Sequence, residues 1–332
     1  MSALLAPDAL AVQTLISYYA RKKLHHHVHT AASQALTKRV NDPTLLLWKA
    51  YALLREGNQA DAIRELESLR GKQGVQLPAL LCLRSAHESF KRQDQEALQN
   101  IKEEIFLEEK GSREGSFFLG AMMSMLLGDY KKARDYVGRT QEIMAGYPQA
   151  KTLAGWIDLL CGSETKAKKA LALFDEAVEA NPKDVDALLG RAAYFEQHRD
   201  ADKAIDVINE VMVANQWFTP AVAEKARLLL SVGDWEQASE AARRALTLDP
   251  NNVEALSLSI VHLLAHDSNL SAACTRIGEL AEVLREHEPR NAALLAASAA
   301  AFARLCARNA PILAQCAELM EAAVRLGPPP PP

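Results

Sequence analysis

The sequence predicts an all-α protein built from repeated pairs of helices, an α-solenoid. Ala (57 residues) and Leu (47) supply nearly a third of the 332 residues, and both are good helix formers. Aromatic residues make up only 6% of the chain, which also favours helices over strands. Hydrophobic residues make up 49%, which excludes a disordered chain. A pattern of about 34 residues recurs, with Gly and Pro interrupting it at short intervals. These interruptions exclude one long coiled coil.

The clearest repeat spans residues 219–252. It contains an apolar first helix (the A helix), a turn at Gly233-Asp234, a second helix (the B helix) and an Asp249-Pro250 end. Proline cannot continue a helix, so it ends the B helix. The same order of features recurs in three stretches: REGNQADAIRELESL (55–69), LLGDYKKARDYV (126–137) and KKALALFDEAVEANP (168–182).

This register predicts nine helix pairs in chain order. Several begin at a proline, which is favoured in the first turn of a helix. The first pair begins near Pro7, and its B helix ends before Asn41-Asp42-Pro43. The other eight pairs are predicted to begin near Pro43, Pro78, Glu114, Pro148, Val185, Thr219, Val253 and Asn291.

Two pairs depart from the pattern. The third has no Gly turn, and its B helix continues to Gly111; the eighth has a long B helix that closes at Glu288-Pro289. The predicted repeat array covers residues 7–326, and residues 327–332 form a proline-rich tail that is disordered or polyproline II. Because each pair contacts only its neighbours in such an array, stability is expected to be a sum of repeat and neighbour terms.

The repeat resembles the tetratricopeptide repeat, in which small residues let the two helices of a pair approach closely. In the 219–252 repeat, Ala226, Ala238 and Ala245 take these small positions. The fifth repeat matches through Ala170, Phe174, Ala177 and Pro182. The resemblance implies a right-handed superhelix with A helices lining a concave groove.

Charge, cysteine content and the length of apolar runs limit the kinds of partner and compartment that we expect for this chain. The net charge of −4 argues against a nucleic-acid partner, which needs a basic face. The five cysteines form no CxxC pair, which indicates free thiols in a reducing compartment. The longest apolar run, residues 292–303, is too short to cross a membrane, so no direct membrane insertion is expected.

The sequence contains no motif of nucleotide binding or catalysis: GxxxxGK[ST], GxGxxG, GxSxG and HExxH are all absent. We therefore expect no enzyme and no cofactor. The run from His25 to His29 places two imidazoles four residues apart on one helical face, a possible metal site. Without a nearby carboxylate or Cys the site is incomplete, and a half-exposed start of a B helix is the preferred interpretation. No metal is predicted.

The register also predicts residues that face the groove: Leu47, Tyr51, Arg55, Leu189, Gln197 and Arg227. This mixed, apolar-leaning lining is typical of a site for a helix or extended peptide of a protein partner. A clamp for a chaperone carboxylate is disfavoured, because such clamps need Asn on the A helices and residues 8–290 place Asn in turns or B helices.

Several stretches are similar to the N-terminal region of the tetratricopeptide repeat protein 21 family. They are LISYYARKKLHHHVHTAA (15–32), residues 42–67, residues 168–192, residues 234–256 and EPRNAALL (288–295). The opening stretch is the most discriminating, because it departs from the general repeat pattern. The resemblance covers residues 10–326 in order, and members of the family are about four times longer than this chain.

The resemblance implies a scaffold subunit of the intraflagellar transport A complex, found in the cytoplasm and in the cilium or flagellum, at the axoneme and basal body. Its implied partners are the other A-complex subunits, with B-complex subunits and membrane-receptor cargo as further candidates. It implies a role in retrograde transport and in the entry of cargo into the cilium. The alternative is an unrelated repeat adaptor, cyclosome-type or chaperone-associated, that binds a peptide or helix in its groove.

Overall fold

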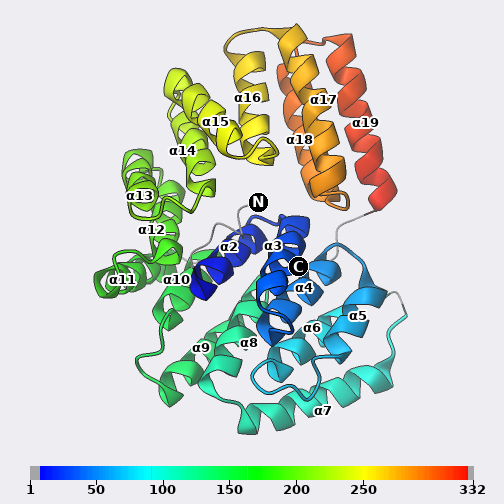
Figure 1. The fold of residues 1–332 in the computed structure, drawn as a ribbon, viewed down its shortest axis with the longest axis vertical. Helices are drawn as coiled ribbons and strands as arrows, with labels where there is room; N and C mark the ends of the chain where they lie inside the picture. The colour runs from blue at the N-terminus through cyan, green and yellow to red at the C-terminus, as the bar shows by residue number, and fades with distance from the viewer. Residues whose placement is uncertain (1–7, 91, 163, 328–332) are drawn as a thin grey trace. The chain divides into compact units, whose positions relative to one another are not determined.

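The computed structural model describes residues 8–327 except residues 91 and 163. This part of the chain contains 18 α-helices and no strand, arranged as nine helix pairs, and it confirms the predicted all-α solenoid of the tetratricopeptide type (Figure 1). The A helices are α2 (Ala9–Arg21), α4 (Pro43–Arg55), α6 (Gln76–Glu88), α8 (Glu114–Leu126), α10 (Ala150–Leu160), α12 (Val185–Gln197), α14 (Pro220–Ser231), α16 (Val253–Ala265) and α18 (Ala292–Leu305). The B helices are α3 (His25–Lys38), α5 (Gln59–Glu67), α7 (Gln95–Gly111), α9 (Tyr130–Ile143), α11 (Glu164–Ala180), α13 (Ala201–Ala214), α15 (Trp235–Leu248), α17 (Leu270–His287) and α19 (Ala310–Leu326).

The eight predicted starts within the described residues lie within two residues of an observed A-helix start. Capping side chains explain this agreement at α4 and α16. Asp42 accepts a hydrogen bond from the Thr44 backbone N–H at 2.9 Å, and Asn252 accepts one from Ala255 at 2.9 Å. Each cap satisfies a backbone donor that the helix itself leaves unpaired. The first start, Pro7, lies outside the described residues; α2 begins at Ala9.

The turn between the A and B helices needs a residue with positive φ. Gly57, Gly128 and Gly233 supply it in the pairs where the sequence shows a Gly turn, with φ of +77°, +84° and +80°. In the sixth and eighth pairs Arg199 (φ 59°) and Ser268 (φ 53°) adopt the same conformation. The fold therefore keeps the turn where the glycine is missing, at the cost of backbone strain that glycine avoids.

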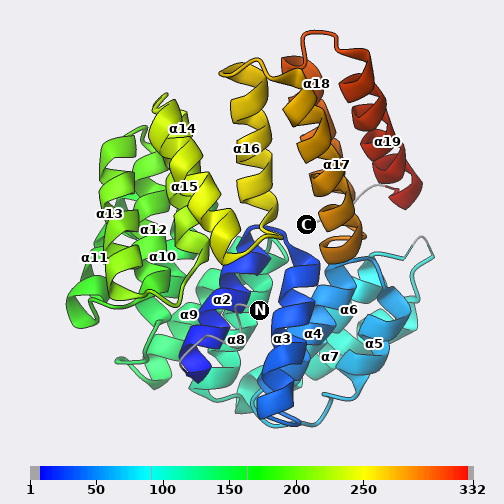
Figure 2. The same ribbon diagram turned by 45° about the horizontal axis from the view of Figure 1, so that its top comes forward.

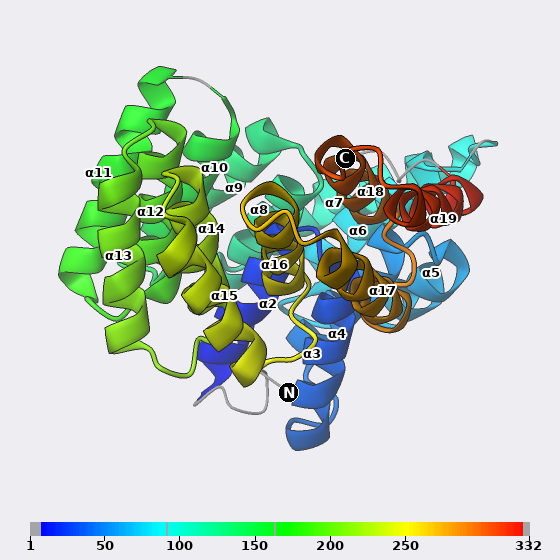
Figure 3. The same cartoon turned by 90° about the horizontal axis from the view of Figure 1, so that it is seen from above.

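The chain divides into two compact units. The N-terminal unit comprises Asp8–Tyr194, and the C-terminal unit begins at Phe195 and continues through α19. In the N-terminal unit α2, α3 and α4 lie side by side, as do α8 and α9 (Figure 2). In the C-terminal unit α14 packs on α15 and α18 packs on α19 (Figure 3).

Small residues allow this close packing. Ala226, Ala238 and Ala245 are at most 5% exposed, as the register predicts. The last two pairs share one apolar core in which Ile260, Leu280 and Phe302 are almost completely buried.

All five cysteines are free thiols. No helix in the described part of the chain combines the length and apolar character needed to cross a bilayer. Of the predicted tail at residues 327–332, Gly327 is described and residues 328–332 lie outside the described residues.

Candidate functional site

The six residues predicted to face the groove divide into two groups. Leu47, Tyr51 and Leu189 are buried, with 0%, 1% and 6% of their surface exposed, so they offer almost no area to a partner. Arg55 and Arg227 are half-buried, and Gln197 is exposed. The structure therefore assigns the apolar half of the predicted lining to the packing between helices and leaves the polar half at the surface.

Tyr51 shows why the apolar positions are buried. Its ring meets the ring of Trp48 edge-on, with centroids 5.9 Å apart, and the ring of His25 at 6.3 Å. Burial raises the pKa of the Tyr51 hydroxyl above its usual range. This tyrosine joins α4 to the start of α3 and is part of the core.

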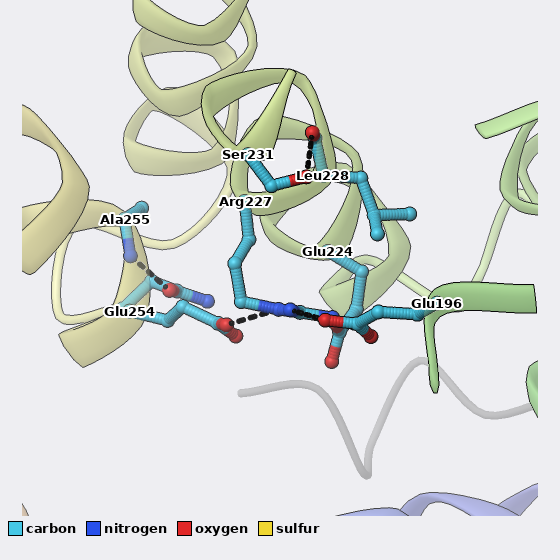
Figure 4. A network of polar contacts seen from close by, with 8 residues as sticks. Glu196, Glu224, Arg227, Leu228, Ser231, Glu254 and Ala255 are labelled. Carbon is cyan, nitrogen blue, oxygen red and sulfur yellow. Dashed lines mark hydrogen bonds and ion pairs between the residues drawn. The ribbon is translucent and has the colours of Figure 1, made fainter. Parts of the chain in front are cut away.

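Arg227 is the centre of a polar network in the C-terminal unit (Figure 4). From α14 it donates through Nη2 to Glu224 Oε2 at 2.9 Å and to Glu196 Oε2 at 2.8 Å. Its Nε lies 3.3 Å from Glu254 Oε1. Glu196 comes from α12 and Glu254 from α16, so one guanidinium joins three consecutive A helices.

Three carboxylates surround the one guanidinium of Arg227 in this network. The Glu224 side chain is only 6% exposed, and its carboxylate pairs with Arg227, as a buried charge requires. Burial lowers the pKa of Arg227, but the hydrogen bond to Glu196 and the charges of Glu224 and Glu254 outweigh it, and the net effect raises this pKa. Arg227 thus stays charged and serves as a clip between repeats.

The N-terminal unit contains a second arginine clip. Arg21, in the last turn of α2, pairs with Asp186 of α12, and its guanidinium lies 4.1 Å from the centroid of the Trp156 ring. The indole Nε1 of Trp156 in turn donates to the Asp186 carbonyl at 3.1 Å. Asp186 is 165 residues from Arg21, so the first pair contacts the fifth and sixth pairs. The expectation that each pair contacts only its neighbours is therefore wrong for this unit.

One acidic partner of each clip occupies the same position in its A helix. Asp186 and Glu254 are the second residues of α12 and α16, in the first turn, where the helix dipole favours an acid. They lie 68 residues apart, which is two repeats of 34. Sequence reasoning identified Arg227 but missed its carboxylate partners. The signal available in the sequence was the acidic second residue of α12 and of α16.

The histidine run begins helix α3, as the preferred interpretation states. His26 Nδ1 lies 2.9 Å from Glu56 Oε1, and the His26 ring stacks on His29 with centroids 5.7 Å apart. His25 instead is enclosed, and burial, helped by the nearby charges of Arg55 and Lys23, lowers its pKa to about 3. His25 and His29 thus lie in different surroundings, and within the described residues this run gathers no three-residue metal-binding group.

Three family profiles match stretches of the chain. The profile described as the tetratricopeptide repeat protein 21 N-terminal ARM repeat matches residues 16–239, and the profile of the second ARM domain of that protein matches residues 275–330. A general tetratricopeptide repeat profile matches residues 224–275.

Individual relatives agree with the profiles. The chain is 33% identical to human tetratricopeptide repeat protein 21B over 321 residues, which is 97% of this chain and 24% of that protein. It is 32% identical to human tetratricopeptide repeat protein 21A over 92% of this chain and 24% of that protein. The chain therefore spans about a quarter of the length of these relatives.

Among solved structures, yeast Tom70 is similar in fold. It has a TM-score of 0.50 and 14% sequence identity, and the match covers 94% of this chain and 92% of Tom70. At this identity the similarity concerns the arrangement of helices alone.

Proposed function

The chain belongs to the tetratricopeptide repeat protein 21 family, and from this premise we propose that it is a non-enzymatic scaffold subunit of the intraflagellar transport A complex. In this proposal it supports retrograde intraflagellar transport and the entry of cargo into the cilium, and it acts through protein–protein contacts. The observation that carries the proposal is the continuous similarity to human tetratricopeptide repeat protein 21B over 97% of the chain.

The arrangement of the helices suits this role. A stack of helix pairs presents an extended surface, and each added pair lengthens it without changing the pairs already present. Both arginine clips lie between A helices of different pairs, which stiffens the surface that a partner would meet. A rigid surface loses less conformational entropy on binding than a mobile one.

The proposed partners are the other A-complex subunits, with B-complex subunits and membrane-receptor cargo as further candidates. The proposed location is the cytoplasm and the cilium. For the contact surface we propose the exposed polar positions of the A helices, of which Gln197 at the end of α12 is an accessible example.

The test is affinity capture of this chain from an extract of ciliated cells, followed by quantitative mass spectrometry. We expect the other A-complex subunits in near-stoichiometric amounts. Gln197→Lys, which places a charge at the end of an A helix, should reduce this recovery. The matched control Gln237→Lys makes the same change at an exposed position of the B helix α15 and should leave recovery unchanged.

Two outcomes would count against the proposal. Enrichment of chaperone or cyclosome subunits in place of A-complex subunits would support the alternative of an unrelated adaptor. Recovery of no partner from an extract in which a full-length relative captures the complex would show that this part of the family's architecture does not hold the assembly contacts.

A further inference from the structure

Two histidines and an aspartate gather at the end of helix α16 in the C-terminal unit. His262 lies in the last turn of α16, His266 caps that helix, and Asp267 follows directly. Because His262 and His266 are four residues apart, they project from the same face. The turn that begins α17 bends the chain at Ser268 (φ 53°), which brings Asp267 back toward both rings.

The potential ligand atoms of these residues converge. Asp267 Oδ2 lies 3.3 Å from His262 Nδ1, and Asp267 Oδ1 lies 3.0 Å from His266 Nδ1. The two imidazole centroids are 5.0 Å apart, and one ligand atom from each residue lies within 4.8 Å of the others. In the described part of the chain this is the one group of three His, Cys, Asp or Glu residues with that spacing.

We propose that His262, His266 and Asp267 bind a divalent transition-metal ion of the zinc class. Two imidazoles and a carboxylate are ligands that zinc prefers, whereas magnesium and calcium prefer oxygen ligands. Tetrahedral zinc with bonds of about 2.0–2.1 Å separates neighbouring ligand atoms by about 3.3 Å. Each Nδ1 lies close to that separation from one oxygen of the Asp267 carboxylate, His262 from Oδ2 and His266 from Oδ1.

Binding requires a rearrangement of protons but no oxidation or reduction. Without an ion, the Asp267 carboxylate is placed to accept a hydrogen bond from Nδ1–H of each ring. When the ion binds, each imidazole is neutral with its proton on Nε2, and the Nδ1 lone pairs and the Asp267 carboxylate contact the metal. Water completes the coordination, because the Asp267 and His266 side chains are 40% and 46% exposed.

Trp235 provides an independent support for the site. It begins helix α15, and its ring stacks on His266 with centroids 5.5 Å apart and planes inclined by 25°. It also meets His262 edge-on at 6.1 Å. The indole thus restricts both imidazoles, which reduces the entropy lost when they bind an ion. In the sequence this site is marked only by the short motif His-x-x-x-His-Asp, which is less conspicuous than the run of His25 to His29.

The test is calorimetric titration of the folded chain with zinc chloride, with magnesium chloride as the control ion. We expect one zinc site per chain and no heat of binding from magnesium. A residue that only holds a metal ligand in place is worth about 10–100-fold in affinity, so His266→Ala, which removes a direct ligand, should weaken zinc binding at least about tenfold. Asp267→Asn should weaken it in the same direction without removing a ring from the packing.

The matched control is the double variant His26→Ala/His29→Ala, which removes two histidines from the other cluster of the chain. It should bind zinc as the unchanged chain does, and zinc should raise the Tm of both. Circular dichroism of every variant verifies that the helices are retained. A second readout is quenching of tryptophan fluorescence by nickel, which should be smaller in Trp235→Phe.

Three results would overturn the proposal. The first is the absence of a zinc heat in the unchanged chain. The second is unchanged affinity in His266→Ala and Asp267→Asn. The third is loss of binding in the His26→Ala/His29→Ala control, which would assign the ion to helix α3.

Discussion

The ring of Phe174 occupies the space that a side chain on Gly190 would need. Phe174 projects from the B helix α11, and Gly190 lies in the A helix α12 of the next pair. Gly155 in α10 faces the same ring, and a Cβ placed there would lie 2.6 Å from Phe174 Cε1. The two glycines therefore let one buried phenylalanine fill the junction of three helices.

We expect Gly190→Ala to destabilise the N-terminal unit, although alanine is the better helix former. Overpacking of a filled core typically costs about 1–3 kcal/mol, which outweighs the gain in helix propensity of about 1 kcal/mol. Thermal unfolding followed by circular dichroism measures the difference.

The matched control is Gly138→Ala in helix α9, where an added Cβ meets no atom within 4 Å. That variant should be as stable as the unchanged chain or more so. Phe174→Leu should relieve the clash of Gly190→Ala in the double variant, since the two positions are in direct contact. Equal effects of the two Gly→Ala substitutions would contradict this account of the junction.

Arg21→Ala should loosen the first helix pair from the rest of the N-terminal unit. The substitution removes the cation–π contact with Trp156 and leaves the carboxylate of Asp186, whose side chain is 19% exposed, without its partner. We expect a loss of about 2–4 kcal/mol. Arg21→Lys should lose less stability than Arg21→Ala, because lysine keeps the charge that pairs with Asp186. It still lacks the flat guanidinium that contacts the Trp156 ring.

Hydrogen exchange resolved by segment provides the measurement for this contact. Exchange should become faster in α2 and in α12, which the arginine joins across 165 residues. Faster exchange confined to α2 and its direct neighbour α3 would mean that the long-range contact contributes nothing to stability.

Arg227→Met should destabilise the C-terminal unit by about 2–3 kcal/mol. The buried carboxylate of Glu224 would lose its ion pair with Arg227, and the cost is below that of a fully buried pair because the Arg227 side chain is 30% exposed. Arg243→Met is the control, because Arg243 also pairs with a glutamate three residues earlier but lies exposed on α15. Urea unfolding should separate the two variants, and equal midpoints would refute the role of Arg227 as a clip.

Acidification should destabilise the protein through His25. The pKa of His25 is about 3 in the folded chain and about 6.5 when unfolded, so between these values the unfolded chain binds the additional proton. Stability from this residue is therefore present above pH 6.5 and falls as the pH decreases, by about 2 kcal/mol at pH 5.

The variant His25→Phe fills about the same buried volume and cannot bind a proton in either the folded or the unfolded chain. Its melting temperature should fall less between pH 7 and pH 5 than that of the unchanged chain, while His198→Gln at an exposed position should behave like the unchanged chain. If all three chains lose the same stability on acidification, then His25 is accessible to protons in the folded state.

The repeat pattern predicted the fold well because the signals that define it are local. The capping side chain of Asp42 and the turn at Gly233 act on backbone groups within a few residues, so the order of residues is sufficient to locate them. The third and eighth pairs were recognised despite their irregular turns, because their B helices end where the sequence indicates, at Gly111 and before Glu288.

The site was predicted less completely, because the helical period does not determine how far a side chain is covered by its neighbours. Tyr51 and Leu189 occupy register positions on the A helices, but packing of adjacent helices buries them. Arg227 was identified from the register. Glu196 and Glu254 lie beside it only because α12, α14 and α16 pack together.

The sequence by itself determined the nine helix pairs, their starts and the small residues between their helices, because each depends on contacts within one repeat or with the next. Only the tertiary structure decided that Arg21 pairs with Asp186 and that Asp267 meets both His262 and His266. The first contact depends on how six successive pairs, from α2 to α12, are stacked. The second depends on the bend after α16 that turns a carboxylate toward the preceding helix.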